Sequence, residues 1–189
     1  GVRLSDGRRL GCDLVILACN TASAKALRSI QQKDLPLLYP SRRVLGVIRP
    51  VTELAGTFTK TGSIGLFATT GTVRSQSYEM EIAKFFPHVK LSQQACPMWV
   101  PLIENNEFEN EGASYFIEKY VGLLMRKDPL IDAIILGCTH YSLIAEQIGR
   151  FIPEKVRLVN QGGIVAKSLA DYFHRHPEIE QKLTRRGTR

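Results

Sequence analysis

Short apolar runs alternate along the chain with longer stretches in which apolar residues recur at helical spacing. The apolar runs are rich in branched side chains, which is typical of strands in a parallel sheet. The predicted strands cover residues 13–18, 44–48, 63–68, 89–94, 133–136 and 156–159. The predicted helices cover residues 22–30, 51–58, 73–86, 112–127, 143–151 and 164–174. This alternation predicts an α/β protein with mainly parallel sheets flanked by helices.

Two further features of the pattern predict where chain segments are buried and where they break. The run 13–18 is continuously apolar, which predicts a strand buried on both faces. Pro36 and Pro40 predict a bend after the first helix, and Pro97 and Pro101 predict an irregular segment in the middle of the chain.

Two of the predicted strands end in the same way. Residues 14–21 and 133–140 each contain an apolar strand, a small residue, a cysteine, a threonine within two residues and the start of a helix. Ligands bind outside the carboxyl ends of strands in open α/β sheets, so we expect Cys19 and Cys138 to face each other across a cleft between two similar lobes. Because a helix N-terminus lowers the pKa of a thiol, we also expect both thiols to ionise near neutral pH.

Charge and hydropathy bear on two classes of protein, those that bind nucleic acid and those that span a membrane. The formal net charge is +7, and much of the excess lies in a tail that contains Lys182, Arg185, Arg186 and Arg189. This pattern argues against nucleic-acid binding, because the tail has neither zinc-finger spacing nor interleaved aromatic residues. No apolar run approaches the roughly 18 residues that a membrane span needs, which excludes an integral membrane protein.

The cysteines favour a reducing, cytoplasmic setting. There are four of them, without a CxxC pair, and a chain of this length needs no disulfide to stabilise its core. Cys12 and Cys96 lack a companion motif, so we expect them to be buried structural thiols.

Three kinds of chemistry could use the remaining cysteines. Cys19, Cys138 and His140 could bind zinc, although structural zinc sites usually have ligand pairs at short spacing. Cys138 and His140 could form a nucleophile and its base, which leaves the matching pattern at Cys19 unexplained. A pair of thiols acting as acid and base explains both patterns, because inversion at carbon needs proton removal from one face and delivery to the other.

Further motifs accompany the two cysteine patterns in order along the chain. They are residues 18–24 (ACNTASA), 46–48 (GVI), 64–66 (IGL) with Thr69, Thr72 and Val73, 100–104 (VPLIE) and 136–141 (LGCTHY). Together they resemble the glutamate racemases of the aspartate/glutamate racemase superfamily. The resemblance implies a cofactor-independent isomerase that interconverts L- and D-glutamate, uses no metal, forms a homodimer, and supplies D-glutamate for peptidoglycan synthesis, cell-wall biogenesis and cell shape.

The resemblance also implies roles for individual residues. Cys19 would act on D-glutamate and Cys138 on L-glutamate, with His140 assisting Cys138. The residues that it implies beside the substrate are Asn20, Thr21, Thr69, Thr72, Thr139 and Glu104, the last of them near the histidine. Purely structural alternatives remain for three of these residues: Thr72 as a helix N-cap, His140 as a loop residue and Glu104 as a solvated charge.

The resemblance further implies two pseudo-symmetric lobes with the cleft between them. Residues 1–48 and 160–189 would form the first lobe and residues 49–159 the second. The family's N-terminal Asp-Ser turn and its Pro-Tyr-Gly loop do not occur in the sequence. We therefore expect an incomplete first lobe that lacks its leading strands, and a chain that alone is poorly folded or inactive.

Other functions remain possible from the sequence. Racemases for aspartate or hydantoins and related decarboxylases also use cysteines at strand ends, and a silent relative would only bind a partner. The histidine in the Gly137–His140 pattern favours glutamate, because aspartate racemases tend to carry an acidic residue there.

Overall fold

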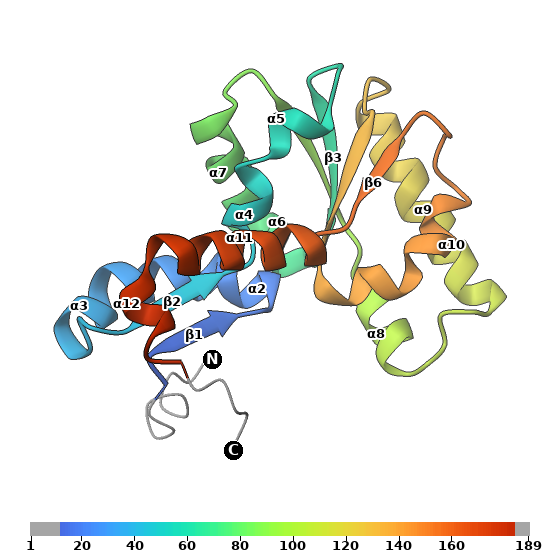
Figure 1. Cartoon of the computed structure of the whole chain (residues 1–189). Coiled ribbons are helices and arrows are strands. Elements are labelled where there is room, and N and C mark those ends of the chain that lie inside the picture. Colours follow the sequence, from blue (N-terminus) through green and yellow to red (C-terminus); the bar gives the residue numbers. More distant parts are fainter. Residues whose placement is uncertain (1–11, 184–189) are drawn as a thin grey trace.

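The computed structural model describes residues 12–183, which form two sheets of parallel strands with helices on both sides (Figure 1). The two-stranded sheet pairs β1 (Leu14–Leu17) with β2 (Arg43–Gly46). The four-stranded sheet has the order β4-β3-β5-β6 and consists of β3 (Ser63–Ala68), β4 (Lys90–Ala95), β5 (Ala133–Gly137) and β6 (Arg157–Val159). All strand pairs are parallel, which confirms the predicted fold class.

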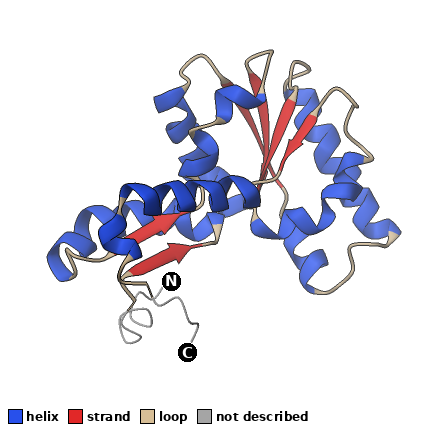
Figure 2. Cartoon of the chain, in the orientation of Figure 1, coloured by secondary structure: helices blue, strands red, loops and turns tan. Residues whose placement is uncertain are grey.

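Helices cover both faces of the four-stranded sheet, as Figure 2 shows by colour. They are α4 (Arg49–Thr52), α5 (Ala55–Phe58), α6 (Thr70–Ser75), α7 (Ser77–Phe85), α8 (Trp99–Glu104), α9 (Glu111–Lys127), the 3₁₀ helix η3 (Thr139–Ile144) and α10 (Ala145–Gly149). Every residue of β3 and β5 is buried. Ile64 and Leu66 pack into one apolar cluster and Phe67 into the cluster on the opposite face. The continuous apolar runs there reflect burial on both faces.

The two-stranded sheet is less completely covered. The chain continues after β1 in a series of helical turns: α2 (Asn20–Ala22), the π-helices η1 (Ser23–Leu27) and η2 (Ile30–Asp34), and α3 (Leu35–Leu38). Near the end of the described residues, α11 (Gly162–Arg175) and α12 (Pro177–Glu180) return beside the sheet (Figure 1). Only Leu17 of β1 is buried, and Ile16 is 39% exposed. The prediction of a strand buried on both faces is therefore wrong for β1, because Ile16 faces a pocket between the sheet and α11.

The proline-based predictions are also wrong at two places. Pro36 lies in the first turn of α3, inside helical turns that continue from Asn20 to Leu38, and Pro101 is the third residue of α8. α8 tolerates Pro101 because the N–H groups in the first turn of a helix have no intrahelical acceptor. Pro36 lies where the π-helical turns of η2 change to the α-helical turn of α3. The helix predicted at 143–151 begins earlier, with 3₁₀ turns from Thr139.

Two predictions concern features that the described residues do not test. Arg185, Arg186 and Arg189 of the predicted basic tail lie outside the described residues. The lobe boundaries 1–48 with 160–189 and 49–159 stay a prediction. Within residues 12–183, no helix is both long and apolar enough to cross a membrane.

Candidate active site

The carboxyl ends of β3 and β5 lie side by side at the centre of the four-stranded sheet. Their register pairs Ala68 with Gly137, so Thr69 and Cys138 follow at the same edge. From β3 the chain continues to β4 on one side, whereas β5 is followed by β6 on the other side. Such a reversal of strand order opens a crevice in which α/β proteins bind ligands. The fold therefore places Cys138 at a ligand-binding position.

The two predicted thiols occupy equivalent local positions. Cys19 precedes α2 and Cys138 precedes η3, each as an N-cap with extended backbone. Cys19 is exposed and Cys138 is buried, with 8% of its surface accessible. A negative charge on Cys19 raises the pKa of Cys138, so the two thiols lie within electrostatic range of each other. All four cysteines are free; Cys96 is buried as predicted, whereas Cys12 is partly exposed.

The electrostatic environment of Cys138 differs from the prediction. Burial raises the pKa of this thiol above its ordinary value, and the charge of Cys19 raises it as well. Hydrogen bonds from the backbone of His140 and Tyr141 lower the pKa but do not outweigh burial. The prediction of a lowered pKa at Cys138 is wrong, because the thiol packs into the apolar cluster around Trp99 and loses its hydration.

We expect this raised pKa to show in alkylation by iodoacetamide. Only the thiolate reacts, so the labelling rate of Cys138 should still be rising at a pH where an ordinary thiol has levelled off. Mass spectrometry of the Cys138 peptide and of glutathione added to the same sample, both labelled briefly between pH 7 and 11, compares the two midpoints. A Cys138 midpoint below that of glutathione would contradict the assignment of burial as the dominant effect.

A histidine and a carboxylate lie next to Cys138. The Nδ1 atom of His140 is 3.7 Å from Sγ of Cys138, and its Nε2 atom contacts the carboxylate of Glu104. Glu104 ends α8, a helix that the sequence pattern did not predict, so the pairing comes from tertiary structure. In this order the imidazole can take a proton from the thiol, while the carboxylate stabilises the imidazolium.

Three threonine hydroxyls form a cluster that joins the two sheets. The Oγ1 atom of Thr21, after β1, lies 2.7 Å from that of Thr69 and 3.2 Å from that of Thr72. The Thr69 and Thr72 hydroxyls are 3.1 Å apart. Thr69 also accepts a hydrogen bond from the backbone N–H of Thr72, so Thr69 is the N-cap of α6. The cluster brings together three of the predicted substrate-binding residues.

Asn20 is enclosed by two residues that sequence reasoning missed. Its side-chain amide donates to Tyr78 Oη at 2.8 Å and to Gln161 Oε1 at 2.9 Å, and it accepts from Gln161 Nε2 at 2.8 Å. Burial raises the pKa of Tyr78 strongly, so its phenol remains neutral. No local motif marks Tyr78 or Gln161, because both meet Asn20 only through long-range packing. Thr139, the residue after Cys138, is exposed, whereas Asn20, the residue after Cys19, is buried.

The described residues also bear on whether the protein could bind a metal ion. Among residues 12–183, no group of three or more His, Cys, Asp or Glu side chains is arranged to hold a metal ion. The zinc alternative for Cys19, Cys138 and His140 therefore has no support in this part of the chain.

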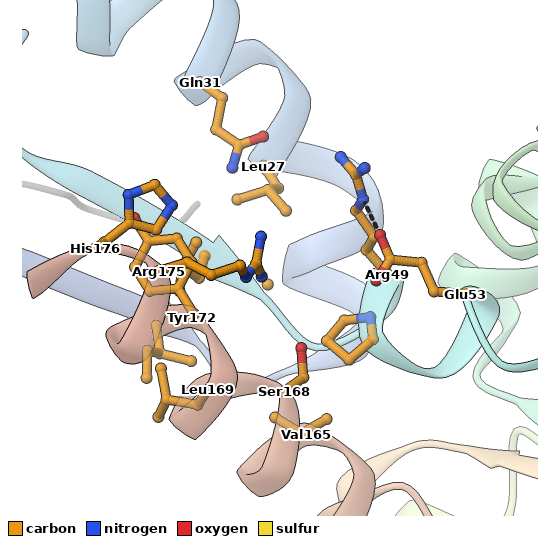
Figure 3. A pocket seen from close by; sticks show the side chains of 14 residues that line it. Leu27, Gln31, Arg49, Glu53, Val165, Ser168, Leu169, Tyr172, Arg175 and His176 are labelled. Atoms are coloured by element: carbon orange, nitrogen blue, oxygen red, sulfur yellow. Dashed lines mark hydrogen bonds and ion pairs between the residues drawn. The ribbon is translucent and has the colours of Figure 1, made fainter.

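A pocket of about 310 Å³ lies away from these residues, between the two-stranded sheet, the helical turns after β1, and α11 (Figure 3). Arg49 and Glu53 form an ion pair at its rim, and Tyr172 and Arg175 line it from α11. None of the predicted site residues is among the side chains that line it.

The chain thus combines a parallel α/β fold, a cysteine after a strand in each of its two sheets, and a histidine–carboxylate pair beside one of these cysteines. The sequence profile of Asp/Glu/Hydantoin racemase matches residues 3–169. The chain belongs to this family.

Individual relatives agree with this assignment. The chain is 42% identical over 180 residues to a glutamate racemase of Ruegeria pomeroyi, which covers 89% of this chain and 65% of the relative. Its fold matches a glutamate racemase isoform of Bacillus anthracis with a TM-score of 0.82 at 29% identity, over 93% of this chain and 63% of that one. It also matches the D-glutamate complex of the Francisella tularensis glutamate racemase, with a TM-score of 0.77 at 26% identity, over 90% and 60% of the two chains. The chain thus spans less than two thirds of these relatives' length.

Proposed function

We propose that the protein interconverts L- and D-glutamate with Cys19 and Cys138 as its two acid–base groups. The observation that carries this proposal is the pair of thiols, each after a parallel strand. The two segments meet where the hydroxyl of Thr21, two residues after Cys19, lies 2.7 Å from that of Thr69, which follows the strand paired with the Cys138 strand. Membership of the racemase family and the glutamate racemases among its relatives support the choice of reaction and substrate.

In the proposed reaction, each thiol serves one face of the α-carbon. With D-glutamate, the Cys19 thiolate takes the α-proton, so that an S–H bond forms and the C–H bond breaks. The electron pair left on the α-carbon delocalises into the carboxylate. Cys138 then gives its thiol proton to the opposite face, which yields L-glutamate, a Cys19 thiol and a Cys138 thiolate. The reverse reaction exchanges the two roles.

Burial makes His140 necessary for the reaction from L-glutamate. Cys138 must begin that reaction as a thiolate, yet burial raises its pKa. The nearby imidazole of His140 can hold the thiol proton, and the carboxylate of Glu104 stabilises the resulting cation. A histidine is suited to this exchange because one ring nitrogen can accept the thiol proton while the other donates to the carboxylate.

The α-proton of an amino acid is only weakly acidic, so the site must stabilise negative charge that develops at the carboxylate. Preorganised hydrogen-bond donors provide such stabilisation. We assign this donation to the hydroxyls of Thr21, Thr69 and Thr139, and Thr72 completes a hydroxyl cluster with the first two. Asn20 and Glu104 would lie beside the substrate without donating to its carboxylate, because both N–H donors of Asn20 are engaged within the protein and Glu104 contacts His140. Thr72 is fully buried, so it acts chiefly by orienting the other two hydroxyls.

The wider role follows from the reaction. D-glutamate would supply peptidoglycan synthesis in the cytoplasm, the protein would form a homodimer, and no cofactor would take part. We also propose that the two lobes divide between residues 48 and 49 and between residues 159 and 160.

Deuterium exchange tests the proposed reaction directly. The product of the complete reading frame that contains this chain is incubated with L- or D-glutamate in D₂O, and proton NMR follows the α-proton signal. We expect the signal to disappear with both enantiomers while the optical rotation falls to zero. A folded product that exchanges aspartate but not glutamate, or neither amino acid, would refute the glutamate assignment.

A further inference from the structure

We infer that Gln161 is a positioning residue that holds Asn20, and through it Cys19, in the geometry needed for proton transfer. The inference rests on the proposed function and adds to it a residue that lies far from both cysteines in the sequence. Gln161 is the N-cap of α11, and 5% of its surface is exposed.

The side-chain amides of Asn20 and Gln161 are paired in both directions. Asn20 Nδ2 donates to Gln161 Oε1 at 2.9 Å, and Gln161 Nε2 donates to Asn20 Oδ1 at 2.8 Å. The second N–H of the Asn20 amide is taken by Tyr78 Oη at 2.8 Å. A primary amide has only two N–H donors, so both donors of Asn20 are engaged inside the protein. In this structure the Asn20 amide therefore has no N–H left for a substrate.

The three partners come from different parts of the fold. Asn20 begins α2 after the two-stranded sheet, Tyr78 lies in α7 beside the four-stranded sheet, and Gln161 begins α11 after β6. Tyr78 is fully buried, and Asn20 is 2% exposed. Hydrogen bonds between buried groups have strict geometry, because no water replaces a lost partner. The network thus fixes where α2 begins relative to the four-stranded sheet.

The position of Cys19 depends on this starting point. Cys19 is the N-cap that precedes Asn20, and its carbonyl oxygen accepts a hydrogen bond from the backbone N–H of Ser23. Cys19 is itself exposed, so packing around its own side chain restrains it little. Cys138, in contrast, is buried in the apolar cluster around Trp99. Loss of Gln161 should consequently disturb proton transfer at Cys19 and leave Cys138 unaffected.

The test compares Gln161→Leu with the exposed control Gln32→Leu in the product of the complete reading frame. Leucine fills similar volume but cannot pair with the Asn20 amide. We expect kcat to fall roughly 10²-fold, as for other small misplacements of reacting groups. The primary isotope effect on kcat/KM should increase with α-deuterated D-glutamate, whose proton Cys19 takes, and decrease with α-deuterated L-glutamate. Gln161→Glu keeps one of the two amide hydrogen bonds and should recover part of the rate.

A merely structural role would lower the folded fraction and leave both isotope effects unchanged, which would overturn the inference. A second readout is independent of racemisation: in Gln161→Leu, iodoacetamide should label Cys19 at a changed rate, with the Cys138 rate unaltered. If the wild-type protein does not exchange glutamate, the proposed function fails. The labelling rates then still decide whether Gln161 positions Cys19, since equal rates in wild type and variant refute it.

Discussion

Replacing either Cys19 or Cys138 with alanine should lower glutamate racemisation by roughly 10²- to 10⁴-fold, the usual contribution of a positioned acid–base group. Alanine removes the sulfur that must take or give the proton and leaves the backbone N-cap in place. Initial rates of change in optical rotation, started from each pure enantiomer, measure the effect. Both variants should be slow in both directions, because every complete turnover uses both thiols.

A control variant separates the loss of an acid–base thiol from the general effect of replacing a cysteine. Cys12→Ala removes a partly exposed thiol without a companion motif and should keep nearly the full rate. A Cys19→Ala variant that retains more than a tenth of wild-type activity in a folded protein would contradict the two-thiol mechanism. Proton transfer at the α-carbon would then have to use Cys138 and His140 without Cys19.

Replacing Trp99 with alanine should lower the free energy of unfolding by about 3–5 kcal/mol, as for other buried aromatic side chains. The indole is fully buried, with ring centroids of Phe67 and Tyr141 each 4.9 Å away and that of Tyr120 at 5.8 Å. Its removal leaves a cavity beneath the turn that carries Cys138. Urea unfolding, followed by circular dichroism on the complete reading-frame product, measures the loss.

Two matched variants sharpen this prediction. Trp99→Phe should cost less than the alanine change, because it retains much of the aromatic volume and removes an indole N–H that has no hydrogen-bond partner. Met98→Ala changes the neighbouring residue, which is 36% exposed, and should have a small effect. A loss below about 1 kcal/mol for Trp99→Ala would show that the aromatic cluster contributes little to stability.

The stability of this cluster also bears on the site. Trp99 begins α8 and Glu104 ends it, so the same short helix anchors the core and presents the carboxylate to His140. Tyr141 connects the same region to β4, because its hydroxyl donates to the carbonyl oxygen of Cys96 at 3.2 Å. Activity should therefore decline in Trp99→Ala at temperatures below the main unfolding transition.

The sequence by itself determined the features that depend on residues close together along the chain. The apolar runs at 63–68 and 133–136 predict strands, and β3 and β5 lie there, because short runs rich in branched apolar side chains favour strands in a parallel sheet. The cysteines after residues 14–17 and 133–137 were placed at strand ends for the same local reason, and the resemblance built on those motifs led to the correct family.

Only the tertiary structure decided the features that depend on contacts between distant segments. The helix α8 forms across Pro101 because Trp99 and Ile103 pack into the core, which the local pattern could not show. The pKa of Cys138 is raised because neighbours from other elements remove its water, whereas the helix-start pattern alone predicted a lower value. The partners of Asn20 are likewise set by packing between sheets. Strand periodicity is a property of the chain, but burial and hydrogen-bond partners are properties of the assembled fold.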